Sequence, residues 1–382
     1  MEVVIIVGVI QSLFLVSLLA AKTNKMPSDK VLMAWLMFAG IFLFSYYAEL
    51  IGLDRQYPFI AFFAFSFGML MGPITYIYIH VLTSQLQKFK WHYLLHGLPY
   101  VSFTLILLIK LQSNDNPLIT EGIKEIEDSK TPIMWAQTIT NIFNGPVYMI
   151  LSWSLLNKHG INIRSKFSYV ENIDLKWLKS VTLSFLILLI VVVLMNVISN
   201  YNDFIDSRTG DDIIFSTLVI LVFFLGYRGV KQQVIFSTKD NHEAVAGKKG
   251  SPDKAQYLHS GLTENESKEY LESLLAIMEK EKPFLNGKLS LNDLADMLNI
   301  SSNHLSQAIN ENLNQNFFDF INGYRVEAIK QRMLDSDSKN LTLLALAYES
   351  GFNSKSSFNN IFKKTTGLTP SQYIHSQPSY KS

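Results

Sequence analysis

The stretch Asn340–Tyr373, NLTLLALAYESGFNSKSSFNNIFKKTTGLTPSQY, decides the fold of the C-terminal part of the chain. It begins with a short helix pattern that has one apolar face, and Gly351 then interrupts this pattern where a left-handed cap is favoured. A polar-faced helix is expected from Ser354 to the next glycine, Gly367, and Thr369-Pro370 supplies the cap and first residue of a final helix. Two short helices joined by a tight turn are the pattern of a helix-turn-helix unit.

The second helix of this unit has two distinct faces. Phe358 and Phe362 fall on the side that we expect to face inward. The polar side chains on the other side are suited to base edges or to phosphate groups. They are Lys355, Ser356, Asn359, Asn360, Lys363 and Lys364.

An earlier segment, at about residues 290–313, repeats the logic, and the later unit spans about 341–364. Ser290 and Asp293 begin its first helix, and Ser301 can cap a second helix over 302–312. A long helix from Phe317 to Met333 would connect the two units, which could then enter successive major grooves, about 34 Å apart. The polar side chains expected to point outward on the second helix are Asn303, Ser306, Gln307 and Asn310.

The first 230 residues have a different composition, because charged residues are thin there although they make up 17% of the whole chain. An apolar helix needs about 20 residues to cross the hydrocarbon core of a bilayer. Seven stretches come close to this length: Val3–Ala21, Val31–Leu50, Pro58–Leu82, Tyr93–Leu111, Ile133–Leu156, Leu178–Asn200 and Ile213–Tyr227. The first has no basic n-region and starts with Glu2, so we interpret it as an uncleaved anchor.

The loops between these stretches predict their orientation. Lysine and arginine are in excess in the first, third and fifth loops and after the last stretch, whereas the fourth and sixth loops are rich in acidic residues. The positive-inside rule therefore places the N-terminus outside and the C-terminus in the cytoplasm.

Glycine and proline interrupt three of the stretches, for example at Gly72-Pro73 and Gly145-Pro146. Such interruptions can open room for a ligand, and they are also common packing features of membrane helices. The polar residues at comparable depth either sense a ligand or bond to a neighbouring helix. They are Gln137, Asn141, Asn144 and Asn196.

Residues 231–262 are polar and rich in Lys, Gly and Ser, so we expect a flexible cytoplasmic linker between a membrane module (1–230) and a cytoplasmic domain (263–382). Thr263 and Glu266 form a capping-box pattern at the start of that domain. The chain contains no cysteine, which excludes disulfide frameworks, thiolate catalysis and cysteine zinc sites. We expect no metal or cofactor and no enzymatic activity.

The segment at about 289–373 resembles the AraC/XylS family of bacterial transcription regulators. FFDFINGYRVEAIKQRML (317–334) resembles the linker helix of that family, including Arg325 and Ala328, and ESGFNSKSSFNNIFKKTTGLTPSQY (349–373) resembles its second helix-turn-helix and closing segment. The resemblance implies DNA contacts at Asn303, Ser306, Gln307, Lys355, Ser356, Asn359 and Asn360. Asn360 stands where many members have Arg, which implies a weaker hold on phosphate.

GPITYIYIHVLTS (72–84) resembles part of the seven-span membrane module that some bacterial AraC-type regulators carry. The expected fold is therefore all-α, with a seven-helix transmembrane bundle followed by a cytoplasmic tandem helix-turn-helix domain. The expected location is the bacterial inner membrane, and the expected partners are double-stranded DNA, the lipid bilayer, a second copy of the chain and an extracellular or membrane-borne ligand.

The expected function is that of a membrane-tethered, sequence-specific transcription regulator. From residue 283 to the end there are nine basic and eight acidic residues, which is a low net charge for a DNA-binding domain. We therefore expect weak binding by one copy, strengthened by pairing in the membrane. The alternative is a membrane receptor or transporter whose cytoplasmic tail binds a protein partner.

Overall fold

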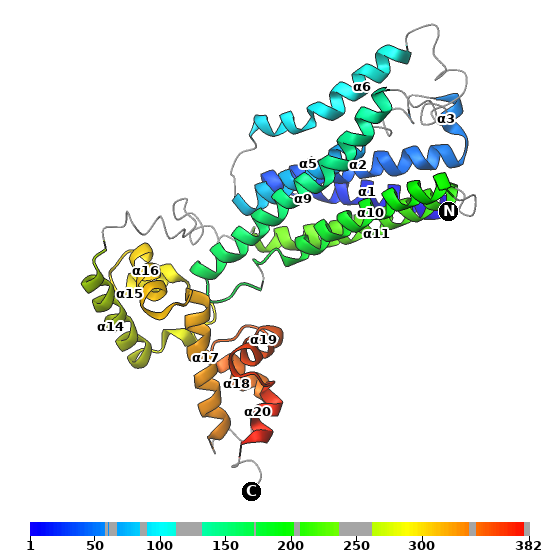
Figure 1. The fold of residues 1–382 in the computed structure, drawn as a ribbon. Coiled ribbons are helices and arrows are strands. Elements are labelled where there is room, and N and C mark those ends of the chain that lie inside the picture. Colours follow the sequence, from blue (N-terminus) through cyan, green and yellow to red (C-terminus); the bar gives the residue numbers. More distant parts are fainter. Residues whose placement is uncertain are drawn as a thin grey trace. The chain divides into compact units, whose positions relative to one another are not determined.

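The computed structural model describes residues 1–57, 60, 67–84, 90–111, 132–171, 173–201, 207–236, 262–335 and 341–377. The regular structure of these residues is helical, apart from one isolated antiparallel bridge between Phe167 and Ser290 (Figure 1). The all-α expectation is thus confirmed for the described part of the chain. It packs as two compact units, the first made of Met1–Asn157 with Leu175–Ser237 and the second of Lys158–Asp174 with Thr238–Ser382.

The first unit contains long, largely apolar helices. They are α1 (Glu2–Ala20), α2 (Pro27–Leu50), the short α3 (Leu53–Gln56), α5 (Gly68–Ser84), the 3-10 helix η1 (Trp91–Gly97), α6 (Leu98–Leu111), α9 (Pro132–Lys166), α10 (Lys176–Tyr201) and α11 (Ser207–Phe236). Among the described residues, three segments are long and apolar enough to cross a membrane: Glu2–Ala20, Pro27–Leu50 and Thr209–Val230. These coincide with the first, second and seventh predicted stretches, and the other four remain predictions.

Several boundaries differ from those predicted. The helix α11 is much longer than the predicted Ile213–Tyr227, because the regular backbone continues through charged residues on both sides of the apolar stretch. The fourth predicted stretch begins as η1 and becomes α-helical at Leu98. The helices α5 and α9 continue through Pro73 and Pro146, so these prolines lie inside helices and do not end them.

Small residues let α1, α2 and α11 approach one another closely. A Cβ atom on Gly40 would lie 2.2 Å from the Ser12 Oγ, and one on Gly226 would lie 2.1 Å from the Leu15 Cδ1. Close approach of helices at small residues is a main source of helix association in lipid, where apolar side chains gain nothing by leaving the solvent. The three segments that meet the length and composition of a membrane span are thus also packed against each other.

The second unit contains the two predicted helix-turn-helix units. Its elements are α14 (Glu264–Lys280), the 3-10 helix η3 (Pro283–Leu285), α15 (Leu291–Met297), α16 (Ser302–Leu313), α17 (Phe317–Leu334), α18 (Leu343–Glu349), α19 (Lys355–Thr366) and α20 (Pro370–Ser376). The predicted caps at Thr263, Ser290, Ser301 and Thr369 are confirmed, and each side chain accepts a hydrogen bond from a backbone N–H in the first turn of its helix.

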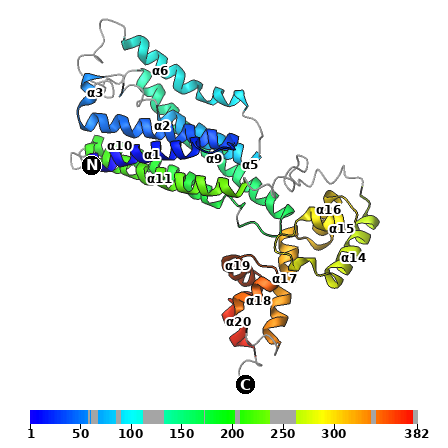
Figure 2. The same cartoon turned by 180° about the vertical axis from the view of Figure 1, so that it is seen from behind.

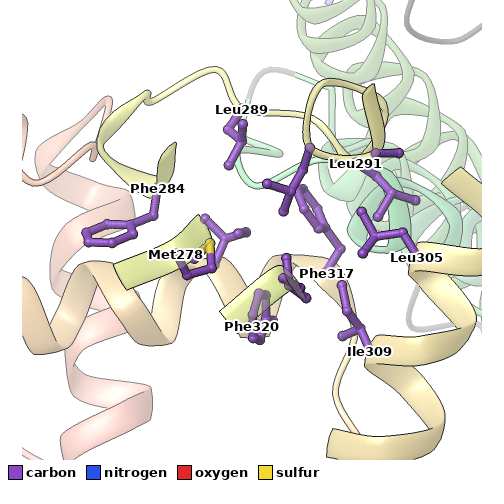
Figure 3. Packing of buried hydrophobic residues seen from close by; sticks show 12 residues of the cluster. Met278, Phe284, Leu289, Leu291, Leu305, Ile309, Phe317 and Phe320 are labelled. Carbon is purple, nitrogen blue, oxygen red and sulfur yellow. The ribbon is translucent and has the colours of Figure 1, made fainter. Parts of the chain in front are cut away.

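Helix α17 belongs to two hydrophobic cores at once. Phe317, Phe320 and Ile321 pack with α14, η3, α15 and α16, as Figure 3 shows. Phe318, Val326 and Ile329 pack instead with Ala347, Phe358 and other residues of the second helix-turn-helix. Figure 2 shows α17 between the two groups of helices from behind. Helix α17 therefore joins the two helix-turn-helix units, because one side of it packs into the first core and a different side packs into the second.

One segment lies where the sequence did not place it. Lys158–Asp174, expected to lie in the fifth loop between membrane stretches, belongs to the second unit and adds Ile163 and Val170 to its second core. Residues 231–236 of the expected linker continue α11. The rest of that linker, 237–261, lies outside the described residues.

Candidate nucleic-acid interface

The second helix-turn-helix is held by two caps and a glycine. Thr342 caps α18, and the Ser354 Oγ caps α19 by accepting from the Ser357 N–H at 3.1 Å. Gly351 has φ +89°, which is the predicted left-handed conformation. Phe352, Phe358 and other aromatic side chains fill the joint between the helices, so the opposite face of α19 is left toward solvent.

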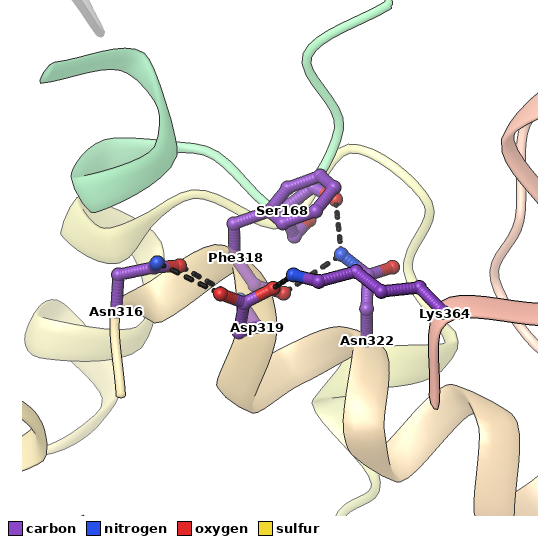
Figure 4. A network of polar contacts seen from close by, with 6 residues as sticks. All are labelled: Ser168, Asn316, Phe318, Asp319, Asn322 and Lys364. Atoms are coloured by element: carbon purple, nitrogen blue, oxygen red, sulfur yellow. Dashed lines mark hydrogen bonds and ion pairs between the residues drawn. The ribbon is translucent and has the colours of Figure 1, made fainter. Parts of the chain in front are cut away.

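The outer face of α19 carries the polar residues that the sequence placed there. Lys355, Ser356, Asn360, Lys363 and Lys364 are exposed and Asn359 is partly exposed. The Lys364 Nζ donates to the Asp319 carboxylate of α17 at 2.7 Å, so this cation is already paired (Figure 4). The outward orientation of this set is confirmed, and its role in DNA contact remains a prediction.

The first helix-turn-helix agrees only in part with the sequence prediction. Asn299 occupies the left-handed region in the turn, with φ 58°, and Asn303 is exposed on α16. Ser306 and Gln307 are buried, with only 9% and 4% of their surface exposed, so the expectation that they face outward is wrong. Asn310 is partly buried.

The reason lies in the surroundings of α16. Helix α14 covers one side of it, where Tyr270 stacks on His304 and the Asn312 amide donates to the Ser267 Oγ at 2.9 Å. The hydrophobic core covers another side. The Gln307 amide donates along the helix to Glu311 at 2.8 Å. The open arc of α16 is therefore narrower than helical periodicity suggests, and Asn303 is the exposed member of the predicted set.

Arg325 joins the parts of the second unit from inside. Its side chain is 1% exposed, and it donates to the carbonyl oxygens of Phe284 (2.8 Å), Asn286 (2.8 Å) and Ser168 (3.2 Å). It also donates to the side-chain oxygens of Asn322 and Ser168. Burial lowers the pKa of Arg325 to about 10, so the guanidinium still carries its charge at neutral pH.

The residues Ser168 and Glu171, which the sequence analysis missed, contact this domain from the segment 158–174. The Ser168 N–H and Oγ both donate to the Leu289 carbonyl, at 3.3 and 2.6 Å. The Glu171 carboxylate accepts from the hydroxyls of Ser354 and Ser356. The sequence feature that points to this packing is a short series of apolar residues, including Val170 and Ile173, inside the predicted fifth loop.

The candidate sensing residues belong to the first unit. The Asn144 amide donates to the Met69 carbonyl of α5 at 2.6 Å. This is a hydrogen bond to a neighbouring helix, which was the alternative to ligand sensing for these polar residues. Gln137 and Asn141 lie on α9 and Asn196 lies on α10, and their side chains are outside the described part of the structure. Ligand sensing at these positions remains a prediction.

Comparison with known proteins bears on the C-terminal region. A family model described as "Helix-turn-helix domain" matches residues 294–376. HTH-type transcriptional regulators of Staphylococcus aureus strains COL and MSSA476 are each 36% identical over 90 residues, which is 24% of this chain and 12% of each relative. A solved structure from Listeria innocua is 28% identical, with a TM-score of 0.25, and the match covers 28% of this chain and 94% of that one.

This chain thus spans about an eighth of the length of the curated relatives it matches, at 12%. The matched residues 294–376 hold α16, α17, α18, α19, α20 and the larger part of α15. The C-terminal part of the chain therefore carries an AraC-type helix-turn-helix domain, like that of proteins named as transcription regulators.

Proposed function

We propose that the chain is a membrane-tethered transcription regulator that binds specific DNA sequences through its second unit. The observation that carries this proposal is the outer face of α19. Two amides, a hydroxyl and three lysines lie on this face, and the opposite face of the helix is buried. Amide side chains pair with adenine edges and lysines with phosphates, so this face offers both kinds of DNA contact.

The tether is proposed from the first unit. Three packed helices with the length and composition of membrane spans lie in the same chain as the helix-turn-helix domain, and the loop charges favour a cytoplasmic C-terminus. A signal from outside or within the membrane would act through this unit. The bacterial inner membrane is the location that fits this arrangement.

The low net charge of the domain favours action in pairs. Phosphate contacts supply much of the affinity of DNA-binding proteins, and one of the lysines on α19 is already paired with Asp319. Two copies held in one membrane would raise the effective concentration of the second reading domain at the DNA. We therefore expect the active form to be a pair of chains.

Binding of the full-length chain in nanodiscs to a pool of randomised duplexes tests the function. Duplexes of about 30 base pairs are long enough for two sites one helical turn apart. The proposal expects enrichment of a sequence and a loss of affinity with rising salt. Asn359→Ala should relax the preference, by about 1–3 kcal/mol for a lost bidentate base contact, while Thr365→Ala on the same helix should not.

The rival function gives a different result. A receptor or transporter whose tail binds a protein would enrich no sequence, and its residual DNA binding would not respond to Asn359→Ala. The orientation has its own test, because the chain contains no cysteine. A single cysteine at Lys25 should react with an impermeant maleimide only after the membrane is opened, and one at Asp54 should react in intact cells.

A further inference from the structure

The segment Lys158–Asp174 is built into the DNA-reading unit as one of its structural parts. It begins inside helix α9, passes Phe167 and ends before α10. Phe167 forms an antiparallel bridge with Ser290 at the start of the first helix-turn-helix, and Val170 is buried in the core of the second. One short segment thus contacts both reading units.

The anchor of this segment is Ser168. The Ser168 carbonyl accepts from the Asn322 amide at 3.0 Å and from the Arg325 guanidinium at 3.2 Å, and the contact with Asn322 is drawn in Figure 4. Asn322 and Arg325 are 2% and 1% exposed. Buried donors of this kind are costly to leave without acceptors, so the segment completes the interior of the domain.

Beyond the anchor, the segment places a carboxylate at the start of α19. One oxygen of Glu171 accepts from the Ser354 hydroxyl, and the other accepts from the Ser356 hydroxyl. The Tyr169 hydroxyl donates to the same carboxylate at 3.2 Å. Ser354 is the N-cap of α19, and Ser356 is one of the side chains that the proposed function assigns to DNA.

We propose that the segment 158–174 is an internal inhibitor of DNA binding, in which Glu171 occupies the position that a DNA phosphate would take at the start of α19. The inference rests on the proposed function. A phosphate and a carboxylate both seek hydroxyl donors and the positive end of a helix dipole, so the two cannot share Ser354 and Ser356. A fixed negative charge at that place also repels an incoming backbone.

The same segment gives the membrane unit a direct connection to the reading surface. It is covalently continuous with α9 at one end and with α10 at the other. A change in these helices that withdraws the segment would remove Glu171 from α19 and expose the two hydroxyls to phosphate. The stretch 237–262 that follows α11 is then not the only covalent route from one unit to the other.

The first test removes the charge of Glu171 and keeps its shape. The full-length Glu171→Gln chain in nanodiscs is titrated with randomised duplexes of about 30 base pairs. Its affinity should rise on the order of fivefold to tenfold at low salt, and its salt dependence should steepen because the repulsion between Glu171 and the phosphates, which salt screens, is lost. Glu327→Gln makes the same change of net charge at an exposed carboxylate that pairs with Lys330, and it should leave both quantities near wild type.

A second test holds the segment in place. Phe167 and Ser290 are an antiparallel pair flanked by the hydrogen bond from the Ser168 N–H to the Leu289 carbonyl, so their Cα atoms lie at about the 4.5 Å of a non-hydrogen-bonded pair, within disulfide reach. The double variant Phe167→Cys/Ser290→Cys has no competing thiol. The oxidised form of this variant should bind the duplex pool more weakly than the reduced form. Because both forms have the same sequence, the reduced form is the control for folding.

The outcomes separate this inference from the proposed function. Tighter binding by Glu171→Gln together with weaker binding by the oxidised chain supports the inhibitor. Equal, salt-dependent binding by wild type, Glu171→Gln and the oxidised chain overturns the inhibitor and leaves the DNA-binding function standing. Failure of wild type and Glu171→Gln to bind any duplex at low salt overturns both.

Discussion

Alanine at Gly351 should destabilise the second helix-turn-helix far more than alanine at Gly367. Both glycines have positive φ, +89° and +79°, so an alanine at either position costs about 1–2 kcal/mol in backbone strain. The surroundings differ. A Cβ on Gly351 would lie 2.4 Å from the Phe284 carbonyl oxygen and 2.9 Å from the Arg325 Nε, whereas the space around Gly367 is open within 4 Å.

A methyl group at position 351 would disturb one particular buried hydrogen bond. The Phe284 carbonyl accepts from the Arg325 Nε at 2.8 Å, so a methyl group there forces apart a buried charge-assisted hydrogen bond. Overpacking of this kind adds about 1–3 kcal/mol to the strain. The total for Gly351→Ala is then about 2–5 kcal/mol, against about 1–2 kcal/mol for Gly367→Ala.

Hydrogen exchange on the full-length chain in nanodiscs measures this difference. Peptides from α18 and α19 report the free energy of opening of the domain, and each 1.4 kcal/mol changes the exchange rate about tenfold. We expect exchange about 100-fold faster than wild type in Gly351→Ala and about tenfold faster in Gly367→Ala. Equal acceleration in the two variants would refute the close approach of Gly351 to Phe284.

Three further predictions concern buried and exposed charge. Arg325→Lys should lower the free energy of opening by about 2–4 kcal/mol in the same exchange experiment, because one ammonium cannot replace five hydrogen bonds from a guanidinium. Lys363→Ala should reduce the salt slope of DNA binding by about 1, and Lys364→Ala should reduce it less, because Asp319 already holds Lys364. Burial, and then Glu171, raise the pKa of Tyr169 from 10.0 to about 12. The folded chain holds this proton more tightly, so docking of the segment weakens as pH rises from about 10 to 12, and Glu171→Gln should lower the pKa of Tyr169 measured by NMR of labelled tyrosine.

The features that sequence predicted well are local ones. Each N-cap contact joins residues three positions apart, as between Ser301 and the His304 N–H, so the participants are visible in a window of a few residues. The same is true of the left-handed glycine at Gly351 and of the buried Phe358 and Phe362 on α19. These features established two helix-turn-helix units before any packing was known.

The misses arose from what packs around a helix. Periodicity assigned Ser306 and Gln307 to the outer face of α16, but α14 and the core leave a narrower arc open than a lone helix has. The predicted number of membrane spans is supported in part. Length and composition support three of the seven stretches among the described residues, and the orientation rests on loop charges alone.

By itself the sequence determined the helix-turn-helix pattern, the polar outer face of α19 and an apolar first part of the chain, because these depend on residues close together along the backbone. Only the tertiary structure decided that Ser168 satisfies the buried Arg325 and that Glu171 covers the start of α19. Those partners are 157 and 183 positions apart, and no local propensity encodes a contact at such separation. It exists because buried donors must find acceptors wherever the fold supplies them.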